Sequence, residues 1–424
     1  MSASPPDRPA RAGRSAVSPA GYPGGAARGL ALSAVLLYAL NLRAPITALA
    51  PVVGDVSADL ALTPAGAGLL TGIPVLCFAI GTPLASVLLA RAGTAAMVTA
   101  SLTTVLLGTV LRSAGGFATA LVGTALIGLA ITVGNVAVPV LIGRDFPHQV
   151  PRVTGLYTAA LNVGSVLTTL FTAPLAGLIG WRWALAAWGV MAVGATFVWL
   201  RAYGVHDPGE PPVVGAAADP DAADTSRPPV HVLRRPVTWL LAVAFSGQAF
   251  GYYAVSAWLP SILHDQLGLA KASAGAAAAL FQLFGVLGGV GVPLALGRRV
   301  PVRVVSSVIA AGWVVLPLGL LLAPQAWPVW CALAGTSQGG NFAVIFTVVA
   351  QSAGSQAAAR RMSATVQTVG YGCAALGPSV MGAVHSATST WVAPLLVVLA
   401  GLLVMAACSQ LALVHVRRDA TASL

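Results

Sequence analysis

The chain has 424 residues, of which 57% are hydrophobic and 8% are charged, and its formal net charge is +11. Soluble domains carry about a quarter charged residues, so this composition excludes a soluble globular protein and indicates an integral membrane protein. The basic residues lie in short breaks between apolar runs, which indicates membrane topology, and we expect no nucleic-acid partner. The four cysteines fall in apolar runs without C-x-x-C spacing, so we expect no disulfide framework, metal site or cofactor.

The first 29 residues are rich in Pro, Ala and Arg and lack the apolar core of a signal peptide, so we expect a disordered cytoplasmic tail. Apolar runs long enough to cross a bilayer follow in two sets. The first set covers about residues 30–53, 64–89, 94–112, 117–142, 153–179 and 183–203. The second covers about residues 237–263, 272–296, 302–323, 326–350, 362–385 and 391–414. Residues 204–236, rich in proline, predict a flexible cytoplasmic linker, and residues 417–424 a cytoplasmic tail.

These runs predict an all-α membrane protein of twelve transmembrane helices in two halves, residues 30–203 and 237–416. The halves resemble each other, since the stretch Gly134-Asn135-Val136-Ala137-Val138 recurs as Gly340-Asn341-Phe342-Ala343-Val344. An even number of helices per half gives both halves the same orientation. The sequence therefore predicts a parallel repeat, with a substrate site near the midplane between the halves.

The distribution of basic residues predicts the orientation. Of the 22 basic residues, Arg112, Arg182 and Lys271 fall in the connections on one side and Arg43 falls in a span, which leaves 18 on the other side. The positive-inside rule places both termini and the central linker in the cytoplasm.

Arg43 is the first candidate for a functional residue, because it falls near the middle of the apolar run over residues 30–53. No acidic residue occurs between Asp7 and Asp55 to neutralise it within that helix. A lone arginine at this depth costs about 3 kcal/mol on insertion scales, so it needs a structural partner or a ligand. Pro45 frees the carbonyl of Asn41 from its helical bond and offers one local acceptor. A buried structural arginine remains the alternative to substrate contact.

Polar side chains inside the other predicted spans form helical stripes. Such groups are costly against lipid, so they face other helices or a cavity. Interhelical hydrogen bonding explains the Ser and Thr residues, including a threonine-rich stripe over 154–172 with Asn162 nearby. For the amides and phenols we expect a cavity lining. The candidates beside Arg43 are Asn41 and Thr47, and the others are Asn135, Tyr157, Gln248, Tyr252, Tyr253, Gln282, Gln338, Asn341, Gln367 and Tyr371.

One motif suggests an enzyme and is set aside. Residues 335–339 match G-x-S-x-G, the nucleophile elbow, but that elbow requires a strand-to-helix turn, and these residues lie within a predicted helix. No Asp or Glu falls at mid-span, so an intramembrane aspartyl protease is excluded as well. We expect no catalytic residues.

The stretch Asn41-Leu42-Arg43-Ala44-Pro45-Ile46-Thr47 resembles the first-helix signature of the cyanate/nitroimidazole transporter family of the major facilitator superfamily. Residues 253–260 (YAVSAWLP) resemble its seventh-helix signature, and Met362-Ser363-Ala364 with Gln367 and Tyr371 resembles the eleventh. The likeness covers about residues 30–415. It implies a transporter of a small anionic or polar solute, with Arg43, Asn41, Tyr253, Trp258, Gln367 and Tyr371 carried over as site residues.

Residues 89–93 are a remnant of the usual gating loop of this superfamily and lack its Asp. We assign Arg91, Arg144 and Asp145 to the cytoplasmic gating region.

The sequence thus predicts a multi-pass protein of the cell membrane that works as a monomer, with the lipid bilayer and a small-molecule substrate as its partners. The expected function is secondary active or facilitative transport by alternating access, with Arg43 in the central cavity. The alternatives are a drug or nitroaromatic efflux pump of the same fold and a passive channel.

Overall fold

The computed structural model describes residues 25–147, 149–205, 232–353 and 356–422; these residues are mainly helical, with short connections and no strand among them. The N-terminal half contains α1 (Gly25–Asn41), α2 (Ala44–Thr47), η1 (Ala50–Val52), α3 (Val53–Asp59), α4 (Pro64–Ala92), α5 (Thr94–Ala114), α6 (Phe117–Asp145), α7 (Val150–Ala187) and α8 (Gly189–Tyr203). The C-terminal half contains η3 (Val232–Arg234), α9 (Pro236–Leu267), α10 (Lys271–Gly297), α11 (Val302–Leu322), η4 (Pro324–Ala326), α12 (Trp327–Ser352), α13 (Gln356–Thr388) and α14 (Val392–Ala422).

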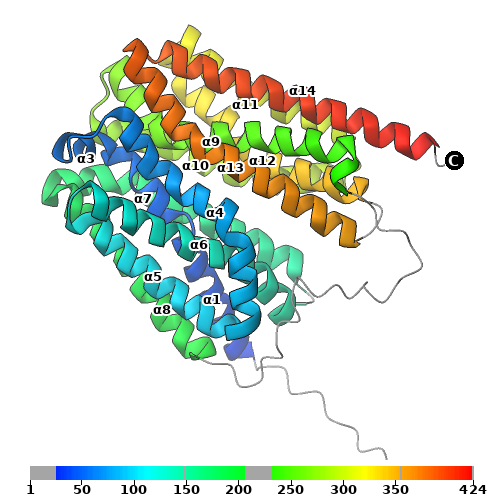
Figure 1. Cartoon of the computed structure of the whole chain (residues 1–424), viewed down its shortest axis with the longest axis horizontal. Coiled ribbons are helices and arrows are strands. Elements are labelled where there is room, and N and C mark those ends of the chain that lie inside the picture. The colour runs from blue at the N-terminus through cyan, green and yellow to red at the C-terminus, as the bar shows by residue number, and fades with distance from the viewer. Residues whose placement is uncertain (1–24, 148, 206–231, 354–355, 423–424) are drawn as a thin grey trace, which may run out of the picture.

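The predicted fold class is confirmed, and the helices follow the predicted spans closely. Most of the predicted N-terminal tail and of the predicted linker lies outside the described residues. In Figure 1 the helices of the two halves run at an angle to each other and come together at the end of the molecule that carries α3, which we call the α3 end.

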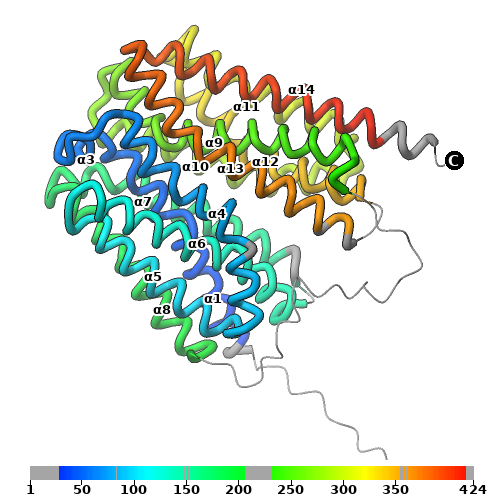
Figure 2. The backbone as a smooth tube through the Cα atoms, viewed as in Figure 1, coloured from blue at the N-terminus to red at the C-terminus, as the bar shows by residue number. Residues whose placement is uncertain are grey.

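The apolar run over residues 30–53 suggests one continuous helix, but the structure shows a broken one. It ends at Asn41, passes through a turn at Leu42 and Arg43, and resumes as the short helices α2, η1 and α3, along the path that Figure 2 traces. Pro45 explains the break, because its ring clashes with the carbonyl of Asn41 four residues earlier. Arg43 itself has non-helical backbone angles (φ −133°, ψ −36°).

The fifth and sixth spans meet at a bend inside α7. Gly180 lies there at φ 79°, ψ 156°, a conformation that residues with a Cβ rarely adopt. The segment from Arg152 to Tyr203 has 52 residues, which is long enough to cross a membrane twice, and the bend allows the chain to turn back between the two crossings.

By length and apolarity alone, nine helical segments of the described chain qualify as membrane spans. The bent segment over 152–203 accounts for two of the twelve predicted spans. Helices α12 and α13 fall outside this set, and both carry polar side chains in predicted spans, among them Gln338 and Asn341 on α12 and Gln367 on α13.

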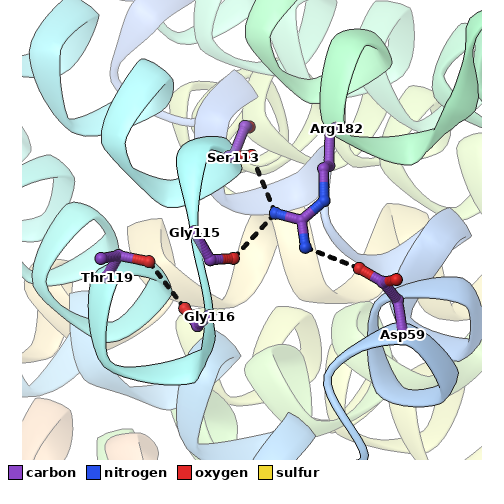
Figure 3. Close-up of polar contacts among 6 residues, drawn as sticks. All are labelled: Asp59, Ser113, Gly115, Gly116, Thr119 and Arg182. Atoms are coloured by element: carbon purple, nitrogen blue, oxygen red, sulfur yellow. Dashed lines mark hydrogen bonds and ion pairs between the residues drawn. The ribbon is translucent and has the colours of Figure 1, made fainter.

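A polar clip fixes the loops of the N-terminal half at the α3 end. The Arg182 guanidinium donates to the carbonyls of Ser113 (3.0 Å) and Gly115 (2.7 Å) and to Asp59 Oδ2 (2.7 Å), as Figure 3 shows. One side chain thus satisfies the exposed carbonyls at the end of α5 and ties α3 to α7.

At the α3 end the two halves touch through glycines. A Cβ on Gly72 of α4 would collide with the carbonyl of Ala375 on α13, and a Cβ on Gly275 of α10 would lie 2.9 Å from the carbonyl oxygen of Thr169 on α7. Gly68 and Gly382 make similar approaches between α4 and α13. We call these contacts the glycine seam. It lets backbones from opposite halves meet, so this end of the molecule is closed.

Candidate functional site

Arg43 lies at the break in the first span, at the start of α2, and is partly exposed. Its Nη1 donates to Asn162 Oδ1 on α7 at 3.1 Å, and the guanidinium carbon lies 5.0 Å from the ring centroid of Tyr252 on α9. No carboxylate of the described residues forms an ion pair with it. The site is therefore a permanent cation, held by an amide of one half and facing an aromatic ring of the other.

A cavity of about 20 Å³ adjoins the guanidinium, which is room for roughly one water molecule. Its lining comes from both halves: Arg43, Ile46, Thr47, Ala50 and Thr71 from the first, and Tyr252, Tyr253, Ser256 and Ala257 from the second. A larger solute can enter only when the halves move apart.

Two tyrosines of α9 lie beside Arg43: Tyr252, whose ring faces the guanidinium, and Tyr253, which lines the same cavity. Tyr371 joins two helices of the C-terminal half to α4, since its ring packs edge-on against Phe245 (5.2 Å) and against Phe78 (5.8 Å). Arg43 thus lies beside an aromatic face and a second phenol, a setting that suits flat solutes and hydrogen-bond acceptors.

A chain of hydrogen bonds orients the α9 side of the cavity. The Tyr252 hydroxyl donates to Gln282 Oε1 at 3.2 Å, and Gln282 Nε2 donates to Ser256 Oγ at 3.1 Å. Two predicted positions, Tyr252 and Gln282, therefore act together with Ser256, because Gln282 of α10 orients two of the α9 side chains that line the cavity.

The break that carries Arg43 is held from the N-terminal half. Thr47 Oγ1 shares a 2.9 Å hydrogen bond with Thr168 Oγ1 of α7, and Arg112 Nη1 donates to the carbonyl of Pro45 at 2.6 Å. The sequence places Arg112 in a hydrophilic connection, but the structure buries it (2% exposed) near the end of α5. Buried in this way, it caps a backbone carbonyl that the broken helix leaves without its usual partner.

Other predicted site residues lie away from Arg43. Asn41 Nδ2 donates to the carbonyls of Leu37 (2.9 Å) and Met191 (3.3 Å), so it faces α8. Gln248 Oε1 accepts from Trp313 Nε1 (2.5 Å) and Asn341 Nδ2 (3.0 Å) in a network inside the C-terminal half. These contacts hold helices together.

Trp258 lies nearer the α3 end. Its Nε1 donates to the carbonyl of Pro378 at 2.9 Å, and its ring lies 5.6 Å from that of Trp391. Both indoles line a second cavity of about 330 Å³, which shares Ala50 with the Arg43 cavity. Within its lining, Lys271 of α10 forms an ion pair with Asp55 of α3, which joins the two halves.

The remaining predicted residues are more scattered. Gln338 of α12 is buried beside Asn162, Gln367 is half-buried one turn before Tyr371 on α13, and Asn135 is exposed on α6. At the end opposite α3, Asp145 pairs with Arg144 (2.6 Å) and accepts from the Tyr203 hydroxyl (2.7 Å). Arg91 is exposed in the last turn of α4.

The sequence interpretation did not assign Asn162 to the site. A signal was present, because Asn162, Ser165 and Thr169 follow i, i+3, i+7 spacing and form one buried stripe of α7. The amide oxygen of an asparagine in a buried stripe can accept a hydrogen bond, so Asn162 was a candidate partner for Arg43.

Comparison with known proteins gives concordant results. Residues 30–378 match the family model described as the Major Facilitator Superfamily. The chain is 32% identical to the "2-nitroimidazole transporter" of Escherichia coli (strain K12), over 86% of this chain and 90% of that protein. It is 27% identical to the "Cyanate transport protein CynX" of the same strain, over 85% of this chain and 91% of that protein.

Among solved structures, the chain resembles a bacterial homolog of the human lysosomal transporter Spinster in an inward-facing, unoccupied conformation. The TM-score is 0.70, the sequence identity is 17%, and the likeness covers 92% of this chain and 98% of that one. At this identity the likeness concerns the fold.

Proposed function

This chain belongs to the major facilitator superfamily, and from that membership we propose that it carries a small anionic or polar solute, such as cyanate or a nitroimidazole, by alternating access. In this proposal residues 30–203 and 237–416 are the two moving halves, residues 204–236 link them, and the protein acts as a monomer in the cell membrane. The observation that carries the proposal is Arg43, a cation without a carboxylate partner among the described residues, beside a cavity that both halves line.

Arg43 suits the recognition of an anion or a nitro group. Its planar fork of donors carries a permanent charge and can bind two acceptor oxygens at once. Asn162 accepts from Nη1, which leaves other donors of the fork for the solute. Because the break at Leu42 turns the guanidinium toward the second half, a bound solute would contact Arg43 on one side and Tyr252 and Tyr253 on the other.

The arrangement of the halves supports alternating access. The glycine seam closes the α3 end, where the Asp55–Lys271 ion pair also crosses between the halves. On the positive-inside rule, the α3 end faces outward and both termini lie in the cytoplasm. Opening the seam would connect the Arg43 cavity with the larger cavity beside Trp258, since both share Ala50.

A transport assay on purified protein in liposomes tests this proposal, with labelled 2-nitroimidazole and cyanate as probes. We expect saturable uptake, and faster uptake of label when unlabelled probe fills the liposomes, because a carrier returns faster with solute bound. A passive channel gives flux without this counterflow. Absence of saturable uptake for both probes would contradict the proposed substrate class.

Tyr252 and Tyr253 beside Arg43 favour the aromatic probe over the linear anion. Competition between the two probes measures this preference. Export of a nitroaromatic compound uses the same site, and the comparison of uptake with release from the liposomes decides the direction.

A further inference from the structure

Gln338 is a buried donor without a partner. The residue is 4% exposed on α12, and among the described residues no group accepts a hydrogen bond from its Nε2. The amides of Gln248 and Gln282, in the same half, each make hydrogen bonds through both their oxygen and their nitrogen. A buried amide left unpaired is costly, so the position of Gln338 calls for an explanation.

The unpaired amide lies near the residue that holds Arg43. A Cβ on Gly285 of α10 would touch both Gln338 Nε2 and Asn162 Oδ1, which lies 3.7 Å from that point. Asn162 Oδ1 accepts from Arg43 Nη1, and a carbonyl oxygen has two lone pairs, so it can accept a second hydrogen bond. Donor and acceptor thus lie on opposite halves and close to the same point beside Gly285.

The distance between helices α7 and α10 increases with distance from the α3 end. The Cβ positions of the α10 glycines are 2.9 Å from Thr169 at Gly275, and 3.7 Å from Thr158 at Gly289. From this level onward a groove of about 310 Å³ separates the helices, and its lining includes Thr158 and Gly155 of α7 and Gly289 and Val290 of α10. Asn162 lies one turn from Thr158 on α7, and Gln338 contacts Gly285, one turn from Gly289 on α10, both toward the α3 end of the groove. A closing movement of the two helices would shorten the distance between the two amides.

We propose that Gln338 is a positioning residue for Arg43: when the groove between α7 and α10 closes, its Nε2 donates to the second lone pair of Asn162 Oδ1. Gln338 of the C-terminal half then orients Asn162, and Asn162 in turn holds the Arg43 guanidinium within the N-terminal half. This inference rests on the proposed alternating access. It links closure of the groove to the placement of the cation, and it explains why Gly285 is a glycine, since any side chain there would separate the two amides.

Crosslinking across the groove tests the inference. Cysteines are introduced as Gly155→Cys and Val290→Cys after the four native cysteines have been replaced by serine, and a short bifunctional reagent reports how often the groove closes. We expect Gln338→Met to slow crosslinking about fivefold, the effect of one ordinary hydrogen bond on an equilibrium. The control is Gln410→Met, because Gln410 bonds to Ser306 and Ser307 on α11, far from the groove, and should leave the rate unchanged.

Two further measurements distinguish positioning from packing. Asn162→Leu should slow crosslinking as much as Gln338→Met, and the double variant should be no slower than either. The melting temperature of Gln338→Met should equal or exceed that of the parent, because the change removes an unpaired donor. An unchanged crosslinking rate in Gln338→Met, or additive effects in the double variant, overturns the inference. The probe uptake assay judges the proposed function separately, so the two failures are distinguishable.

Discussion

Two arginines lie among the apolar helices of the N-terminal half, and their surroundings assign them different roles. Arg112 is buried and caps the Pro45 carbonyl, while its Nε and Nη2 have no partner among the described residues. Arg43 is partly exposed, and its guanidinium faces a cavity and the ring of Tyr252. We therefore expect the first to stabilise the break in the helix and the second to contact a solute.

At this scale we predict that Arg43→Ala abolishes saturable binding of 2-nitroimidazole or cyanate while the protein still inserts and melts near the parent temperature. The substitution removes a charge that has no counter-ion in a low-dielectric site, so the free energy of unfolding should change little. Arg43→Lys should lose about 2 kcal/mol or more of binding free energy if a two-pronged contact is lost. Variants at Gln367 or Tyr371 should lose about 1 kcal/mol. Thermal melting and equilibrium binding on the same purified variant provide the measurement.

Arg112→Met serves as the matched control, since it also removes a guanidinium but leaves Arg43 in place. It should change the melting temperature and retain binding of the probe. Normal affinity in a destabilised Arg43→Ala protein would instead make Arg43 a structural residue.

At the scale of helices, the sequence predicts the positions of the spans well because length and apolarity determine them. It predicts Arg43 for the same reason, since a charge within an apolar run stands out. It does not predict which neighbour a polar stripe faces. Gln248 and Tyr252 occupy one stripe of α9, yet Gln248 bonds inside its own half and Tyr252 faces Arg43. The spacing of a stripe shows which side chains share a face of one helix. Which helix packs against that face depends on contacts between segments that are distant in the sequence.

The glycine seam gives a prediction for α4 and α13. A leucine at Gly72 would collide with the carbonyl of Ala375 and force the helices apart at the α3 end. We therefore expect Gly72→Leu to expose the Arg43 cavity from that end. In a variant without native cysteines, Ser256→Cys reports this exposure, and its labelling by a membrane-impermeant thiol reagent should become faster.

The control for this wedge is Gly194→Leu on α8, because a Cβ there meets nothing within 4 Å. It should leave the labelling of the cysteine at position 256 unchanged. A lower melting temperature in Gly72→Leu without faster labelling would show that the seam only stabilises the fold.

At the scale of the whole molecule, the Asp55–Lys271 ion pair connects the halves beside the cavity that Trp258 lines. Its groups are partly exposed, so it should contribute at most about 1 kcal/mol. Asp55→Asn should accelerate labelling of the cysteine at position 256 by up to about fivefold. The exchange of both charges, Asp55→Lys with Lys271→Asp, should restore the parent rate, and 1 M salt should reduce the difference. Equal labelling rates for the single and the exchanged variants would show that this ion pair does not hold the halves together.

The orientation of the protein is also a prediction at this scale. The basic residues place the linker over 204–236 in the cytoplasm. A cysteine introduced as Ala222→Cys, again in a variant without native cysteines, should therefore be labelled only after the membrane is permeabilised. Labelling of intact cells at this position would reverse the assigned orientation.

The break in the first span has a kinetic consequence. Its bonds to Asn162, Thr168 and Arg112 all come from the N-terminal half, so Arg43 moves as a rigid part of that half. Tyr252 moves with the other half, so its distance of 5.0 Å from the cation changes whenever the halves rotate. A cation over an aromatic face contributes about 0.5–2 kcal/mol, and the two orientations of the carrier therefore differ in free energy. The half-saturation concentrations measured from the two sides of the membrane should then be unequal. Without an energy source, the Haldane relation requires the maximal rates in the two directions to be unequal in the same ratio.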